Sequence, residues 1–181
     1  MISSNIAKRY ARAFFEIAGE EARYEAYHQE LDRFSELMKE NSDLSEFLAN
    51  PVFEQADKKA VVETLLAKAG ISGLTANFIK LLVDKRRIGI LAEIEASYRT
   101  LMDEALQKAR VTVRTAFPLT DDTAESLRKG LEKMTGREVE MTVQEDPSLL
   151  GGIAVRIGDT LYDGSIRTQL DNLKNLLGEE I

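Results

Sequence analysis

The sequence predicts an α+β fold, with an N-terminal bundle of six helices over residues 1–106 and a small mixed α/β domain over residues 107–181. Three observations predict it. Apolar residues recur at helical spacing as far as about residue 108, and beyond that point they alternate with polar residues as in a half-buried strand. The connections between the periodic segments are short, as in a helix bundle. The length of 181 residues is sufficient for two small domains.

Capping and breaking residues divide the N-terminal part into its helices. Ser3, Ser4 or Asn5 is expected to cap the first helix, and Gly19 is expected to end it. Later boundaries are expected at Asn41 or Ser42, at Asn50-Pro51, at Gly70 and at Ser72. The predicted helices then cover about residues 5–18, 21–40, 44–49, 55–69, 73–87 and 90–108.

The C-terminal part combines alternating segments with two further helices. Strands are predicted over about residues 110–117, 138–143, 153–157 and 160–162, with a tight hairpin turn at Gly158-Asp159. Thr120 and Ser165 are expected to cap the helices. If the first two strands pair, Arg110 and Arg114 are expected near Glu138 and Glu140. Gly151-Gly152 precedes a strand and lacks a following Lys-Ser/Thr, so it indicates a close approach of two backbones and not a phosphate loop.

The residue composition closes most routes to catalysis. The chain has no cysteine and one histidine, which excludes a disulfide scaffold, a thiolate metal site and a cysteine nucleophile. His28 has only Asp32 at helical spacing, and we interpret the two as a surface pair. Asp121-Asp122 fits the first turn of a helix, where acids complement the dipole. We therefore expect no catalytic, cofactor or metal site, and the net charge of -7 argues against nucleic-acid binding.

Two features favour binding of a partner. The first helix has two apolar stripes, where a single stripe is sufficient to cover one side of a core, so it is either buried centrally or lines a docking groove. The run Lys85-Arg86-Arg87 either complements the dipole of the fifth helix or joins cations of the first helix in a basic rim that attracts an acidic partner. The stripes are Ala7, Ala11, Phe14 and Ala18, and Ile6, Tyr10, Ala13 and Ile17; the first-helix cations are Lys8, Arg9 and Arg12.

Several segments, in order along nearly the whole chain, resemble one family. The segments are residues 7–18 (AKRYARAFFEIA), residues 47–52 (FLANPV), Asn77-Phe78 with Leu81-Leu82, and residues 87–91 (RIGIL). The most specific are residues 146–159 (DPSLLGGIAVRIGD) and 163–167 (DGSIR). Together they resemble the delta subunit of F-type ATP synthases, the counterpart of the mitochondrial oligomycin-sensitivity-conferring protein.

The resemblance implies a non-catalytic stator subunit. In this family the N-terminal six-helix bundle sits on the alpha/beta catalytic head and holds an N-terminal helix of an alpha subunit between its first and fifth helices. The C-terminal domain meets the b-type peripheral stalk. The resemblance implies no cofactor, no nucleic-acid partner, no membrane insertion and no homo-oligomer in the complex. Since the N-terminus shows no targeting segment, we expect a peripheral position on the cytoplasmic side of a bacterial membrane.

The family's two contacts are carried over to residues of this chain as follows. The groove is expected at Ala7, Tyr10, Ala11, Phe14, Phe78, Leu81 and Leu82, with Lys85 and Arg86 at its rim; the stalk contact is expected at Leu149, Leu150, Ile166, Leu170 and Leu173. Which stripe of the first helix faces the partner stays open. Asp in place of Phe14 or Ala11 is expected to weaken binding without unfolding the domain. The alternative is an unrelated helical adaptor that uses the basic rim to bind nucleic acid or an anionic membrane.

Overall fold

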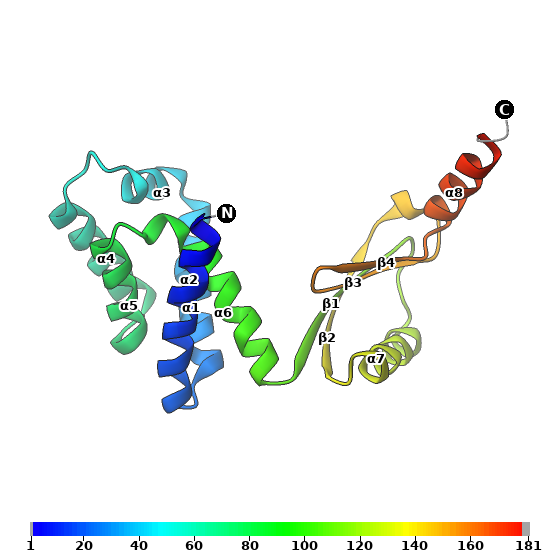
Figure 1. The fold of residues 1–181 in the computed structure, drawn as a ribbon, viewed down its shortest axis with the longest axis horizontal. Coiled ribbons are helices and arrows are strands. Elements are labelled where there is room, and N and C mark those ends of the chain that lie inside the picture. The colour runs from blue at the N-terminus through cyan, green and yellow to red at the C-terminus, as the bar shows by residue number, and fades with distance from the viewer. Residues whose placement is uncertain (1, 179–181) are drawn as a thin grey trace. The chain divides into compact units, whose positions relative to one another are not determined.

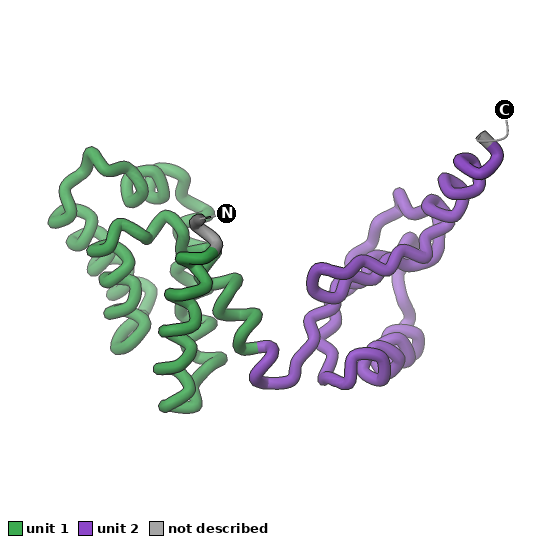
Figure 2. Tube along the Cα trace, in the orientation of Figure 1, with its two compact units in different colours: residues 1–102 green, residues 103–181 purple. Residues whose placement is uncertain are grey.

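A computed structural model describes residues 2–178 as two compact units that divide between Met102 and Asp103 (Figures 1 and 2). The division falls inside a helix, four residues before the expected boundary, and Gln107 then turns the chain into the first strand with a positive φ of 53°. The fold class is α+β, because the strands all belong to one sheet in the second unit.

The first unit is helical, and its helices follow the predicted order. The differences lie at the ends. α1 begins before the expected caps and continues through Gly19, and α5 ends at Asp84 because Arg86 adopts a left-handed conformation with φ 55°. The bounds are α1 Ile2–Glu20, α2 Tyr24–Glu40, α3 Ser42–Ala49, α4 Gln55–Ala69, α5 Gly73–Asp84 and α6 Leu91–Ala105, with a 3-10 turn at Ile88–Ile90.

Caps account for several of these helix boundaries. The Asn41 side chain accepts a hydrogen bond from the Leu44 amide at 3.1 Å and so caps α3. Gly70 ends α4 in the left-handed conformation. Ser72 is the N-cap residue of α5, as predicted, but its side chain makes no capping hydrogen bond.

The core of the first unit is built around the ring of Phe14. This ring stacks on Phe78 of α5 with centroids 4.3 Å apart, and it contacts Tyr98 of α6 at 5.4 Å and Tyr27 of α2 at 5.8 Å. The Tyr98 hydroxyl donates to the Tyr24 carbonyl at 3.1 Å, and burial raises the pKa of this hydroxyl. One side chain of α1 therefore contacts three other helices.

His28 forms a largely buried hydrogen bond with Glu95 that joins α2 to α6, and its predicted pairing with Asp32 on the surface is wrong. Its Nε2 lies 2.9 Å from Oε1 of Glu95, and its ring stacks on Tyr98. Burial alone would raise the pKa of Glu95, but the hydrogen bond from His28 and the charge of Arg99 outweigh it and hold the pKa below its ordinary value. Sequence spacing could not indicate this pair, because its members lie 67 residues apart.

The second unit is a four-stranded sheet with a helix on one face. The strand order is β2-β1-β3-β4, with β1 and β2 parallel and the other neighbours antiparallel. α7 connects β1 to β2 and packs Leu127 and Leu131 against the valines of that face (Figure 1). The bounds are β1 Lys108–Thr115, α7 Asp121–Thr135, β2 Glu138–Glu145, a 3-10 turn at Pro147–Leu149, β3 Ile153–Ile157, β4 Thr160–Asp163 and α8 Ile166–Gly178.

The pairing expected between arginines of β1 and glutamates of β2 is confirmed for one of the two arginines. Arg110 lies 3.1 Å from Glu140, as predicted, and also 2.8 Å from Asp103. Arg114 instead pairs with Asp146 at 3.2 Å. Its register partner on β2 is Gln144, because the two strands are parallel and both run toward Asp146.

The most specific motif segments have structural roles in this unit. The Asp146 carboxylate accepts hydrogen bonds from the Ser148 amide and hydroxyl, and the Ser165 side chain accepts one from the Thr168 amide at 3.2 Å and caps α8. Gly152 has φ 74°, and a Cβ there would overlap the Gly164 carbonyl oxygen. The predicted close approach of two backbones is confirmed, and it brings the start of β3 against the start of α8.

Replacing Glu95 by Gln is expected to make the first unit less sensitive to acid. Because the folded-state pKa of Glu95 lies below the unfolded value of 4.5, the interactions of its ionised carboxylate stabilise the unit fully above that pH and are lost as the pH falls through the folded pKa. At pH 7 the variant is expected to be less stable by about 1–3 kcal/mol. Urea unfolding at pH 7 and at acid pH, followed by tyrosine fluorescence, measures both effects.

Glu93→Gln is the matched control, because Glu93 is exposed on the same helix. Four of the five tyrosines lie in the first unit, so the fluorescence reports mainly on it. An acid-induced loss of stability that is equal in wild type and Glu95→Gln would contradict this role of the Glu95 carboxylate.

Candidate functional site

The two apolar stripes of α1 face different environments. Ala7, Ala11 and Phe14 are each at most 1% exposed, so this stripe packs inside the unit. The second stripe faces outward, and Ile17 on it is 43% exposed. The expectation that Ala7, Ala11 and Phe14 line a docking groove is therefore wrong. Their side chains are used to hold α1 against its neighbouring helices.

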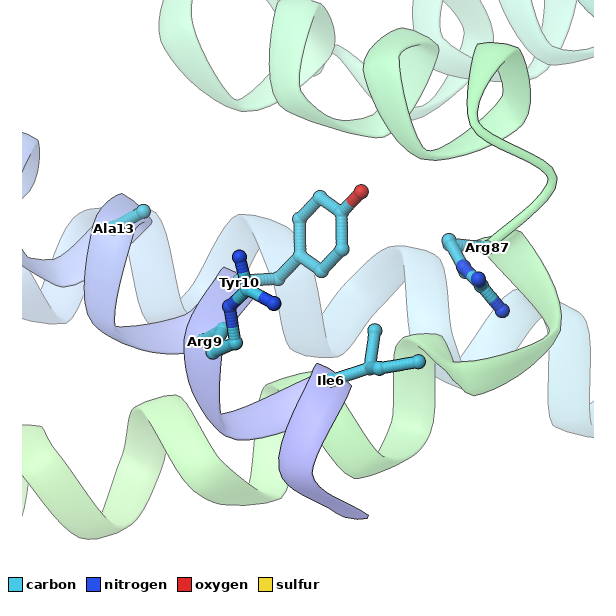
Figure 3. Close-up of a pocket in the computed structure, with 5 residues that line it drawn as sticks. All are labelled: Ile6, Arg9, Tyr10, Ala13 and Arg87. Carbon is cyan, nitrogen blue, oxygen red and sulfur yellow. The ribbon is translucent and has the colours of Figure 1, made fainter. Parts of the chain in front are cut away.

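A pocket of about 420 Å³ lies over the outward stripe (Figure 3). Ile6 and Tyr10 point from α1 into the space that Arg87 borders from the segment after α5. Ala13 and Arg9 complete its lining. Of the expected groove residues, only Tyr10 lines this pocket. The other four lining residues were not assigned to the groove, but the sequence analysis named all of them as candidates. Ile6 and Ala13 belong to the second stripe, and Arg9 and Arg87 belong to the basic rim.

α5 borders the same side of α1 through its ring contact with Tyr10. The rings of Tyr10 and Phe78 meet edge to face with centroids 6.4 Å apart. Phe78 and Leu82 are buried in the core, so they too are wrongly expected to contact a partner directly. Leu81 is 42% exposed and stays available for contact.

The run Lys85-Arg86-Arg87 does not form one continuous rim. Arg87 lines the pocket over α1, but Arg86 lines a different pocket beside Gln55 of α4. Lys85 is exposed and lines neither of these two pockets. The left-handed conformation of Arg86 separates the three side chains. This places Arg86 outside the predicted groove.

α8 carries an apolar stripe that stays largely exposed among the described residues of its own unit. Helix α8 projects beyond the end of the sheet in Figure 1. Leu149 is wrongly expected at the stalk contact, because it is only 4% exposed and packs with Ala116 and Ala154. The other expected residues are exposed, as are two more leucines of α8. The exposed set is Leu150, Ile166, Leu170, Leu173, Leu176 and Leu177.

The sheet face opposite α7 is open and polar. A pocket of about 300 Å³ on this face is lined by Thr112 and Arg114 of β1, Gln144 of β2 and Arg156 of β3, with Leu161 of β4 at its side. The charge of Arg114 in this pocket is compensated by Asp146. The more apolar surface of this unit is therefore the stripe on α8.

Two other kinds of site are absent from the described residues. Within residues 2–178, no group of three His, Asp or Glu side chains is placed to hold a metal ion. No helix in this range is both long and apolar enough to cross a membrane. The candidate sites of the described chain are therefore apolar contact surfaces.

Comparisons with known proteins agree on one family. Residues 6–177 match the model of the family described as ATP synthase delta (OSCP) subunit. The chain is 60% identical over 181 residues to the ATP synthase subunit delta of Syntrophus aciditrophicus, with all of both chains covered, and 44% identical over 177 residues to that of Desulfatibacillum aliphaticivorans, with 98% and 97% covered. These matches exclude an unrelated helical adaptor.

The fold has a counterpart among solved structures. A chain in the cryo-EM structure of the Toxoplasma gondii mitochondrial ATP synthase hexamer superposes with a TM-score of 0.69 at 22% sequence identity. The match covers 94% of this chain and 96% of that chain. At this identity the comparison supports the fold.

Asp in place of Phe14 is expected to unfold the first unit, in contrast to what the sequence predicts. It removes the ring that contacts three helices and buries a carboxylate, so the unit is expected to lose more than about 3 kcal/mol. Ile17→Asp, on the outward stripe of the same helix, is expected to change stability by no more than about 0.5 kcal/mol. Thermal unfolding followed by circular dichroism compares them, and equal stability of the two variants would contradict the assignment of the stripes.

Proposed function

Because the chain belongs to the ATP synthase delta (OSCP) subunit family, we propose that it is a non-catalytic stator subunit that links the alpha/beta catalytic head to the b-type stalk and resists rotor torque. It is a peripheral stalk subunit of the proton-translocating ATP synthase complex. One observation carries the proposed linking role. Each of the two units has its own uncovered apolar helix surface, on α1 in the first and on α8 in the second.

In the proposal, the six-helix N-terminal unit, residues 1–106, binds an N-terminal helix of an alpha subunit. The contact consists of the outward stripe of α1, with Arg9 and Arg87 at the pocket and Leu81 on α5. An amphipathic helix fits this surface, because the stripe of Ile6, Tyr10, Ala13 and Ile17 repeats at helical spacing. The two arginines favour a partner helix with carboxylates beside its apolar face.

The proposed stalk contact uses α8 in the C-terminal unit, residues 107–181. Ile166, Leu170, Leu173 and Leu177 are spaced alternately by four and three residues, which is the spacing of a helix that packs along another helix. All four are exposed. The partner in this proposal is a helix of the b-type stalk.

Binding energies support the use of two surfaces. Fully burying a large apolar side chain contributes about 1.5–3 kcal/mol, and Ile6 and Tyr10 are already partly buried. Association costs at least about 4 kcal/mol, so the α1 surface alone gives weak binding. Attachment that lasts under torque then comes from several contacts made at once. The proposed place of the protein is the cytoplasmic face of the membrane, held there through its partners.

Ile17→Asp is expected to weaken binding of an alpha N-terminal peptide at least about tenfold, because the new carboxylate must lose water inside an apolar contact. Isothermal titration of the full chain with the N-terminal peptide of the alpha subunit from the same complex measures the change. Val61→Asp, at an exposed position on α4, is the matched control and is expected to bind normally. Unchanged affinity of the folded Ile17→Asp protein would refute the α1 contact.

The double variant Leu170→Asp/Leu173→Asp is expected to retain the alpha and beta subunits of the head and to lose the b subunit of the stalk. The tagged protein is purified from detergent-solubilised membranes, and the alpha, beta and b subunits that accompany it are quantified. Asn172→Asp/Asn175→Asp adds the same charge to exposed positions of α8 beside the stripe and is expected to retain b. Retention of b by both double variants would place the stalk contact elsewhere.

A further inference from the structure

A second pocket in the first unit lies where α3 ends, α4 begins and α5 ends. Its volume is about 250 Å³, and Pro51, Gln55, Lys58, Arg86 and Gly89 are among the residues that line it. It shares none of its lining residues with the pocket over α1. The proposed stator contacts therefore leave this pocket without a role.

Lys58 is a buried cation at this pocket. Its side chain belongs to a residue only 4% exposed, and its Nζ donates to the Leu48 carbonyl at 2.8 Å and the Asn50 carbonyl at 2.6 Å. An ammonium group has three N–H donors, so the two neutral carbonyls leave one donor for a further acceptor. Within residues 2–178 no carboxylate forms an ion pair with Lys58, whereas its neighbour Lys59 pairs with Asp84 at 2.6 Å. A buried charge without a counter-charge is costly.

Arg86 supplies a second cation, and a side chain of α4 orients it. The Gln55 side-chain amide satisfies both neighbours in one of its two orientations. In that orientation its nitrogen donates to the Val83 carbonyl and its oxygen accepts from Nε of Arg86, both at 3.1 Å. This hydrogen bond uses Nε and leaves the two terminal nitrogens of the guanidinium, which bind oxyanions well. No carboxylate in residues 2–178 forms an ion pair with Arg86.

The pocket also borders the first turn of α4. Gln55 and Lys58 belong to this turn and line the pocket, and Glu54 makes no capping hydrogen bond through its side chain. The positive end of a 15-residue helix thus faces the pocket, and Asp57 in the same turn offsets part of its charge. Capping of α3 explains the two carbonyl contacts of Lys58, but it does not explain the oriented Arg86 or the cavity between them.

We propose that this pocket binds a small oxyanion, a carboxylate or a phosphate, between the ammonium of Lys58 and the guanidinium of Arg86. The bound anion neutralises the buried cation and ties the ends of α3, α4 and α5 together. A free ion and a carboxylate side chain of a partner subunit offer the same chemistry to the pocket. The site lies apart from the proposed alpha contact, so the two can fail independently.

The test is a titration of the full chain with inorganic phosphate and, separately, with acetate, at constant ionic strength maintained with chloride. Backbone amide NMR shifts of Gln55, Lys58 and Gly89 are expected to move and saturate. Arg86→Gln is expected to weaken binding about tenfold through loss of charge-assisted hydrogen bonds. Lys85→Gln removes the same charge one residue away, outside the pocket lining, and is expected to bind as wild type. Arg86→Gln carries the test because Lys58 also caps α3.

Each outcome decides the proposal. Saturation with phosphate alone supports a tetrahedral ion, and saturation with acetate as well supports a carboxylate from a free ion or a partner chain. Shifts that never saturate with either anion overturn the site. An anion affinity that is the same in Arg86→Gln and wild type also overturns the site. An affinity that falls as much in Lys85→Gln as in Arg86→Gln overturns it too, because long-range charge then explains the response.

Discussion

The packing of the Phe14 ring fixes the rotation of α1, and the exposed surface of the first unit depends on that rotation. The ring contacts Tyr27, Phe78 and Tyr98, which come from α2, α5 and α6. Small side chains at Ala7 and Ala11 share its face and let α1 approach the other helices closely. With this stripe turned inward, the second apolar stripe lies beside it, about 100° around the helix, at the edge of the buried face, where Ile17 stays 43% exposed. The pocket over α1 is thus a consequence of how the core packs.

The second unit reaches a similar result by another route. Its sheet needs one helix to cover its apolar face, and α7 does this with Leu127 and Leu131. The close backbone approach at Gly152 then brings the start of α8 to the end of the sheet, away from that face. The leucines of α8 therefore find no core in their own unit. Exposed apolar patches of this kind mark surfaces that bind other proteins.

The sequence was sufficient for the elements but not for the contacts between them. Periodicity predicts α4 at its observed bounds and the β3–β4 hairpin, because local spacing and turn residues determine both. It could not decide which stripe of α1 is buried, since both stripes are apolar and lie side by side. That choice depends on rings 13 to 84 residues away in the chain. The pairing of His28 with Glu95 also depends on the tertiary fold.

The turn after α5 shows how a sequence motif can mislead about a site. Lys85-Arg86-Arg87 looks like a single basic patch, but the backbone turns sharply there. The three amides donate to the carbonyls of Leu81, Val83 and Leu82 at 2.9, 2.9 and 2.7 Å. These bonds offset the roughly 1–2 kcal/mol that a left-handed conformation costs a residue such as Arg86. As a result Arg87 faces the pocket over α1 while Arg86 faces Lys58. Adjacent cations therefore belong to two sites, and a substitution at one of them tests only the pocket that it lines.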